Sequence, residues 1–148
     1  MDCEYHYRLT RRAEKELDDI LDYIGNTLDN AKAAAKLMED IGRCMETVCV
    51  FPEGGALVTN AFLPRKIIRK KVVGNYLLYY RADKERKTVW LLRIVYGRLV
   101  VMDIDYYERT MQEMEEAKLI LEGLDDVEAG RTVDGPTAMA ELREKYGL

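Results

Sequence analysis

Two helix-forming patterns joined by a very short connection constrain the fold of this chain more than any other feature. Residues 11–27 and 31–48 each carry apolar side chains at helical spacing, and Thr10 and Asn30 stand where each helix would take its N-cap. So short a connection favours two helices that lie antiparallel. Gly54 and the residues around it then break the helical pattern. The sequence therefore predicts a helical hairpin whose apolar side covers another layer.

Strand-forming segments lie on both sides of the expected hairpin. They are rich in β-branched and aromatic residues and cover residues 4–9, 66–73, 75–82 and 88–96. Gly74 with Asn75 is a turn signal, and the charged run after Ala82 fits a hairpin loop. We therefore expect an α+β fold in which the helical hairpin covers an antiparallel sheet.

The charge of the chain changes abruptly near Arg98. Residues 1–98 contain 18 Lys and Arg against 14 Asp and Glu, a net charge of +4, whereas residues 99–148 contain 5 against 13, a net charge of −8. Within the first part, residues 65–98 hold 11 of the basic residues and only two acids. We interpret this as a basic domain over residues 1–98 whose surface is covered by an acidic segment over residues 99–148.

The acidic segment has the pattern of short helices. After an apolar run over residues 99–104, a helix is expected from residue 105 or 106 to about Glu122, and Thr137 would cap a last helix over residues 138–145. The side chains along one side of the longer helix are Met111, Met114, Ala117, Lys118 and Leu121. We expect the methionines to pack against the basic domain. Because short helices with few core residues gain order by lying on another surface, the segment is predicted to be an arm of the domain.

Composition excludes several classes of function. Hydrophobic residues make up 48% of the chain, but no apolar run reaches the roughly 20 residues that a membrane helix needs. The N-terminus lacks the pattern of a signal peptide, so we expect a cytoplasmic protein that does not bind a membrane. Cys3, Cys44 and Cys49 have no metal-binding spacing relative to His6, and no glycine-rich phosphate loop occurs. Neither a metal nor another cofactor is expected.

The basic domain resembles the RelE/ParE toxin superfamily. Residues 11–20 look like its opening helix, and residues 33–37 and 51–55 are similar to its second helix and the following turn. Residues 73–80 and 89–98 resemble its two central strands. The resemblance implies a toxin of a type II toxin–antitoxin system, of the kind that serves plasmid stabilisation. Where the family often continues with a second arginine and an aspartate, this chain has Leu99 and Val100, so the C-terminus of the toxin is replaced or truncated.

The acidic segment resembles a different family, the Phd/YefM-type antitoxins. Residues 99–109 look like the middle of such antitoxins, and residues 122–131 and 140–147 look like their toxin-wrapping end. The resemblance implies a fusion, natural or engineered, whose antitoxin segment binds in cis or reaches a neighbouring chain to form a homodimer.

Contacts between the two parts are expected from apolar and acidic side chains of the segment. These side chains are Val101, Ile104, Leu119, Leu121, Leu124, Asp125, Asp126 and Glu128. The acids are expected to approach basic residues of the strands. The basic candidates are Arg69, Lys70, Lys71 and Arg93.

The toxin resemblance leaves two activities open. ParE-like members inhibit DNA gyrase and need a binding surface, whereas RelE-like members are ribosome-dependent mRNA endonucleases and need cations with an acid–base set. The candidates for binding the target or nucleic acid are Lys66, Arg69, Lys70, Lys71 and Arg81. The candidates for RelE-like catalysis are Arg69, Arg93, Tyr96 and Arg98.

The residues of the middle strand favour the ParE-like activity. Tyr76 stands where RelE-like nucleases usually place an arginine, and His6 is remote in the sequence, so the acid–base set is incomplete. Two further alternatives stay open. One is a nucleic-acid-binding module without catalysis, which would contact phosphates through residues 65–98. The other is an inert toxin–antitoxin fusion.

Overall fold

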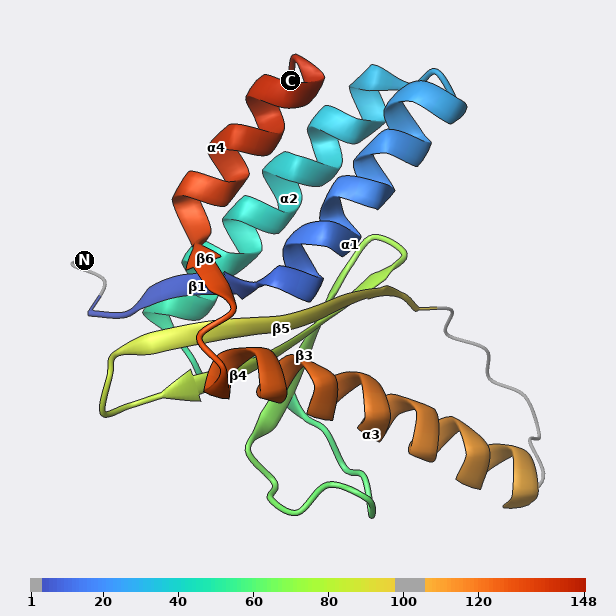
Figure 1. Ribbon diagram of the computed structural model, residues 1–148, viewed down its shortest axis with the longest axis vertical. Coiled ribbons are helices and arrows are strands. Elements are labelled where there is room, and N and C mark those ends of the chain that lie inside the picture. Colours follow the sequence, from blue (N-terminus) through green and yellow to red (C-terminus); the bar gives the residue numbers. More distant parts are fainter. Residues whose placement is uncertain (1–3, 98–105) are drawn as a thin grey trace.

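The computed structural model describes residues 4–97 and 106–148, which form a mixed sheet between two helical layers (Figure 1). The strands are β1 (His6–Thr10), β2 (Ala56–Leu57), β3 (Ile68–Val73), β4 (Tyr76–Asp83), β5 (Thr88–Tyr96) and β6 (Thr132–Asp134). Their order in the sheet is β2-β3-β4-β5-β1-β6. The expectation of an antiparallel sheet is wrong at one pair, because β1 runs parallel to β5. A parallel pair needs a long crossover, and the whole chain between these strands provides it.

Helices cover both faces of the sheet. They are α1 (Arg11–Asp22), the π-helical turn η1 (Tyr23–Thr27), α2 (Ala31–Val50), α3 (Tyr106–Glu128) and α4 (Gly135–Tyr146). Figure 1 shows α1, α2 and α4 together on one face and α3 on the other. The predicted hairpin is therefore confirmed, but a third helix joins its layer. The helix expected over residues 11–27 is α-helical to Asp22 and then widens into the π-helical turn.

Side-chain caps define the helix ends. The Thr10 hydroxyl accepts a hydrogen bond from the Ala13 N–H, and the Asn30 amide oxygen accepts one from the Ala33 N–H, as predicted. The prediction that Thr137 caps the last helix is wrong. The cap is Asp134, whose carboxylate accepts the Thr137 N–H at 3.1 Å and the Thr137 hydroxyl at 2.7 Å. These two hydrogen bonds lower the pKa of Asp134 and begin α4 at Gly135.

The sheet separates two hydrophobic cores. The larger core lies under α1, α2 and α4, and includes Leu17, Ile41 and Leu91. The smaller core lies under α3, where Leu92 and Ile120 are fully buried. Each such side chain contributes about 1.5–3 kcal/mol when it is fully buried. The described structure is thus held by apolar contacts on both faces of one sheet.

The C-terminal residues are an integral part of these layers. Strand β6 pairs antiparallel with β1, with Thr132 opposite Thr10, and the α4 residues Met139 and Leu142 are buried in the larger core. The segment lies on the first domain, as expected of an arm, but it supplies more core residues than expected and also a strand of the sheet. Helix α3 has 23 residues and is therefore longer than the helix expected to end at about Glu122. Strand β6 was not predicted, because three residues are too few to give a sequence pattern. The apolar run over residues 99–104 lies outside the described residues.

Candidate functional site

Helix α3 is fixed to the sheet by a partly buried hydrogen-bond network. The Tyr79 hydroxyl on β4 donates to Glu116 Oε2 at 2.8 Å. The Asn60 side-chain amide donates to Glu116 Oε1 at 2.9 Å and to the Glu113 carbonyl at 2.8 Å. Burial and the hydrogen bond to Glu116 raise the pKa of Tyr79 far above its ordinary value, so the phenol remains a neutral donor. Two uncharged donors therefore hold the Glu116 carboxylate between the strands and the helix.

Asp126 joins the C-terminal part of α3 to the beginning of α1. Its side chain is 2% exposed. The carboxylate accepts the Arg12 backbone N–H at 3.2 Å, Arg12 Nη1 at 2.5 Å and Arg131 Nε at 2.8 Å. A buried carboxylate is stable when its oxygens are paired in this way, and its charge also suits the positive end of a helix. The interaction links residues that are 114 positions apart in the sequence.

The partners predicted for Asp125 and Asp126 are wrong. Asp126 binds Arg12 and Arg131 rather than Arg69, Lys70, Lys71 or Arg93, and Asp125 binds Arg131 at 2.6 Å. The reason is geometric, because α3 places this turn beside the end of β1 and the start of α1. Glu128 is exposed and lines a hollow that Arg65 and Arg81 also line.

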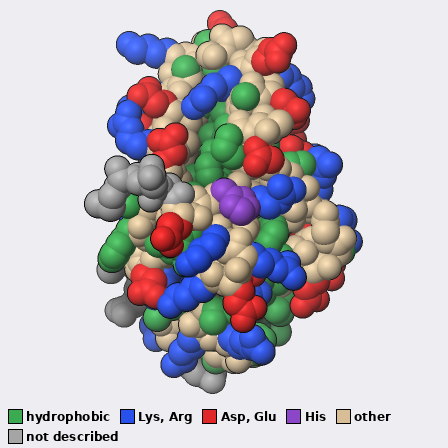
Figure 2. Space-filling model, turned by 90° about the vertical axis from the view of Figure 1, so that its left-hand side faces the viewer, with side chains coloured by type: hydrophobic (Ala, Val, Ile, Leu, Met, Phe, Trp, Pro, Cys, Tyr) green, Lys and Arg blue, Asp and Glu red, His purple; other side chains and the backbone are tan. Residues whose placement is uncertain are grey.

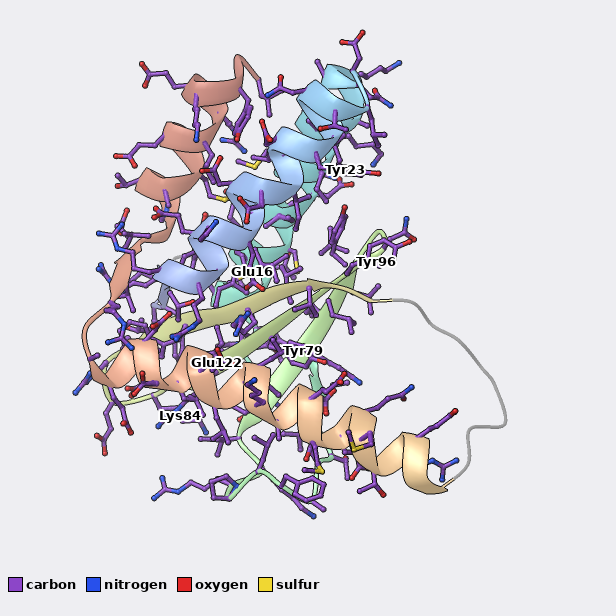
Figure 3. All side chains as sticks on the ribbon, turned by 45° about the vertical axis from the view of Figure 1, so that its right-hand side comes forward. Glu16, Tyr23, Tyr79, Lys84, Tyr96 and Glu122 are labelled. Atoms are coloured by element: carbon purple, nitrogen blue, oxygen red, sulfur yellow. The ribbon has the colours of Figure 1, made fainter. Side chains whose placement is uncertain are left out.

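Arg93 is held between α1 and α3. Its Nε and Nη2 atoms donate to the two carboxylate oxygens of Glu16 at 2.9 and 3.0 Å, and its Nη1 atom donates to the Leu119 carbonyl at 3.2 Å. Glu16 also accepts the Ile94 N–H at 3.2 Å. Figure 3 shows Glu16 on α1 and Glu122 on α3, on either side of β5. The bidentate pair fixes α1 against the strand, and the bond to the Leu119 carbonyl fixes α3. Arg93 therefore has structural partners, whereas the sequence also allowed it to contact a phosphate.

Helix α4 is attached to α1 through Asp18. Lys145 Nζ donates to its carboxylate at 2.9 and 3.0 Å, and the Tyr146 hydroxyl donates to the same group. Burial alone would raise the pKa of Asp18, but the hydrogen bonds from Tyr146 and Lys145 outweigh it and lower that pKa. Burial and the bond to Asp18 raise the pKa of Tyr146. The Asp18 carboxylate is therefore ionised when α4 is packed on α1.

The structure distributes the predicted target-binding cations over both faces of the sheet. Arg69 and Lys71 share the face of the larger core, because their neighbours across the strand pair, Tyr80 and Leu78, belong to that core. By the same criterion, Lys70 lies on the face that α3 covers, since it is paired with Tyr79. Arg81 lies on that face too, since it is paired with Ile68.

Lys66 and Arg69 line the same hollow beside the end of α2. The hollow has a volume of about 300 Å³ and also contains Lys84 and the exposed ring of Phe51. Arg69 Nη1 donates to the carbonyls of Glu53 at 3.1 Å and Gly55 at 2.7 Å, so it fixes the loop before β2. Figure 2 shows the side of the molecule that carries the β4–β5 hairpin, where Lys and Arg side chains gather below the single histidine.

Tyr96 lies with two other tyrosines at the far end of β5. Its side chain is 64% exposed, and its ring meets the Tyr76 ring edge-on with 5.7 Å between centroids. Tyr23, which Figure 3 shows on the same side of the molecule, is also exposed. Burial, Tyr96 and Tyr23 together raise the pKa of Tyr76. His6 is at the opposite end of β5, 3.1 Å from the Thr88 hydroxyl, and Arg98 lies outside the described residues.

The apolar contacts of α3 differ in part from those expected. Leu119 and Leu124 are half-buried, but Leu121, Met111 and Met114 are exposed, so the predicted inner side of the helix is wrong. The residues on the side facing the sheet are Ala117, Ile120, Leu124 and Val127. Their 3–4–3 spacing was an available signal, but it competes with the equally helical spacing of the methionines. Val101 and Ile104 lie outside the described residues.

Sequence reasoning missed five residues that join elements around the sheet, and they lie on α1, β4 and α3. They are Arg12, Glu16, Asp18, Tyr79 and Glu116. The α1 residues belong to a highly charged stretch over residues 11–19, which predicts a solvated helix face. Over residues 4–97 and 106–148, no cluster of three His, Cys, Asp or Glu side chains could hold a metal ion. Over the same residues, every helix is too short or too polar to cross a bilayer.

The comparisons with known proteins identify the first part of the chain. Residues 7–99 match the family model of the ParE toxin of type II toxin–antitoxin system, parDE. No curated protein matches the chain. The family match covers more than half of the 148 residues and ends where the charge of the sequence changes. It confirms the RelE/ParE resemblance of the basic domain and implies an antitoxin partner, while the Phd/YefM resemblance of the acidic segment stays a prediction. The chain belongs to the ParE toxin family of type II toxin–antitoxin systems.

Proposed function

We propose that residues 1–98 are a ParE-like toxin domain directed at DNA gyrase, and that residues 99–148 neutralise it in cis as an antitoxin segment. The observation that carries the proposal is the buried Asp126 cluster. There the C-terminal segment supplies a carboxylate to an arginine and to the helix N-terminus of the family domain. A buried carboxylate that is paired in this way is typical of a specific docking contact rather than of a loosely attached tail.

Three separate attachments support the role of the segment. Helix α3 covers the open face of the sheet, β6 extends the sheet beyond β1, and α4 packs beside the α1–α2 hairpin. A segment that holds three surfaces of a toxin domain at once restricts the access of a large target. Tethering places the segment at an effective concentration on the order of millimolar, so even moderate contacts would be saturated.

The positions of the cations favour a target-binding toxin over a nuclease. Arg93 is engaged with Glu16, and Arg69 is engaged with two backbone carbonyls. An endonuclease of the RelE type needs cations free to stabilise a phosphate transition state, together with an acid and a base. Tyr96 is exposed at the end of β5, but His6 belongs to β1 and lies beside Thr88, at the opposite end of β5. A ParE-like mechanism requires a binding surface alone, and Lys66 with the neighbouring hollow offers exposed positive charge for it.

The test weakens the docking of the segment within the full chain. The variant Glu116→Ala/Asp126→Ala is expressed beside the parent chain and beside Glu39→Ala/Asp40→Ala, a control that removes two acids from the exposed side of α2. We expect growth inhibition and loss of gyrase-catalysed supercoiling with the docking variant, and neither effect with the control.

Other outcomes assign other functions. Cleaved mRNA with normal DNA supercoiling would establish the RelE-like alternative. A docking variant that stays folded and harmless would establish an inert fusion. Analytical ultracentrifugation of the parent chain separates cis docking, which predicts a monomer, from exchange of the segment between two chains.

A further inference from the structure

Helix α3 is apolar on two sides, although the protein covers one of them. Ile120 faces the sheet and is fully buried. On the outer side, the side chains of Met111, Met114 and Leu121 are 42%, 48% and 42% exposed. A surface helix normally turns one apolar side inward and a polar side outward, and a helix with two apolar sides lies between two layers. Among the residues that the structure describes, no second layer covers these three side chains.

The outer side of α3 forms a groove with a loop of the toxin domain. The groove has a volume of about 440 Å³ and is lined by Phe62 from the loop and by Met114, Ala117, Lys118 and Leu121 from the helix, with Glu122 and Asp125 further along it. Asn60 positions the loop, because its side-chain oxygen accepts the Phe62 N–H at 2.9 Å while its amide group donates to α3. The α3 groove is therefore complete only when the helix is seated on the sheet.

The charge of α3 indicates what fits this groove. The helix carries eight acidic residues and two basic ones, a net charge of −6. Three of the acids, Glu116, Glu122 and Asp126, bind groups of the toxin domain. Asp125 pairs with Arg131, whereas Glu115 is exposed beside Met114. A second copy of the same acidic helix would be repelled. Methionine side chains adapt to differently shaped partners, and an amphipathic helix docks in a groove through apolar anchors.

We propose that the α3 groove binds a basic amphipathic helix of a partner protein. This goes beyond the proposed function, because the occupant is neither the gyrase target nor the antitoxin segment. Since the groove is built from the toxin domain and from α3 together, a bound helix stabilises the seated position of α3. The partner would thereby favour the neutralised form of the chain.

Fluorescence anisotropy with the full chain tests the proposal. The probe is a labelled 14-residue peptide of leucine and lysine arranged at helical period, compared with a scrambled peptide of the same composition. We expect the patterned peptide to bind at least about tenfold more tightly than the scrambled one. In Met114→Glu/Leu121→Glu, binding should weaken by about tenfold or more, although two negative charges have been added. Phe62→Ser should weaken it as well.

A matched control separates docking from simple charge attraction. Leu28→Glu/Val50→Glu adds the same charges at side chains that are 54% and 51% exposed on other surfaces, and it should leave binding unchanged. The proposal is overturned if Met114→Glu/Leu121→Glu binds the peptide as well as the parent does, if both peptides bind equally, or if neither binds. It is also overturned if ultracentrifugation shows a dimer of the parent that this variant dissociates, because the occupant would then be a second copy.

Discussion

Replacing Asp126 with alanine removes the acid that joins α3 to α1. The change leaves Arg12 and Arg131 without their shared carboxylate and leaves the Arg12 N–H without its acceptor. Removing one partner of a buried ion pair costs about 3–5 kcal/mol when the other partner stays buried. The arginine side chains are 37% and 47% exposed and can regain water, so we expect a loss of about 2–3 kcal/mol in the free energy of unfolding.

Urea unfolding followed by circular dichroism measures this loss, and an unchanged m-value shows that the folded state is comparable. Asp126→Asn should cost less, about 1–2 kcal/mol, because the amide keeps an acceptor for the helix N–H. A double-mutant cycle with Arg12→Ala should give a coupling energy of about 1–2 kcal/mol. Asp19→Ala is the control, since its carboxylate pairs with Lys15 at the surface and should contribute less than about 0.5 kcal/mol.

Two results would refute the reasoning about Asp126. A loss below about 0.5 kcal/mol would mean that water replaces the carboxylate without penalty. A coupling energy near zero would mean that Asp126 stabilises α3 independently of Arg12. In either case the Asp126 cluster would no longer support a specific docking of the C-terminal segment, and the proposed neutralisation in cis would lose its main observation.

Three further changes test the packing of the C-terminal residues. Gly135→Ala should lower the melting temperature, because its new Cβ would lie 2.6 Å from the Tyr7 carbonyl oxygen; overpacking of this kind costs about 1–3 kcal/mol, and an unchanged melting temperature would contradict the close approach. Leu142→Ala should cost about 2–4 kcal/mol in urea unfolding because the side chain is 6% exposed, and a loss below about 1 kcal/mol would place α4 outside the core. Because folding lowers the pKa of Asp18, its contribution to the free energy of unfolding should be complete above a pH of about 3.9, the ordinary pKa, and should decline as the pH falls through the lower pKa of the folded state. Asp18→Asn should remove this part of the acid dependence of stability. An identical acid dependence in both proteins would contradict the contribution of Asp18.

Local elements could be predicted from the sequence because their causes are local. The strand expected over residues 88–96 matches β5, and Thr10 and Asn30 cap the helices expected after them. Alternation of side chains and the hydrogen-bonding ability of a capping residue act within a few positions, so they are visible in a short window. The order of these elements also carried the resemblance to the toxin family, which the family match confirms.

The inner side of α3 could not be chosen from periodicity. Met111, Met114 and Leu121 form one stripe at helical spacing, and Ala117, Ile120, Leu124 and Val127 form another. Both stripes satisfy the same pattern, so the sequence allows either to face the sheet. The second stripe faces inward together with Glu116 and Asp126, whose partners Tyr79 and Arg12 are supplied by the toxin domain.

By itself, the sequence determined the types and order of the longer elements, the α+β class and the family of the first domain. The tertiary structure decided which charges meet. Arg93 pairs with Glu16 across 77 positions, and Arg12 pairs with Asp126 across 114. The physical reason is the range of the interactions. Helix and strand patterns arise between neighbours in the chain, whereas an ion pair forms wherever packing brings two groups within about 4 Å and excludes water from them.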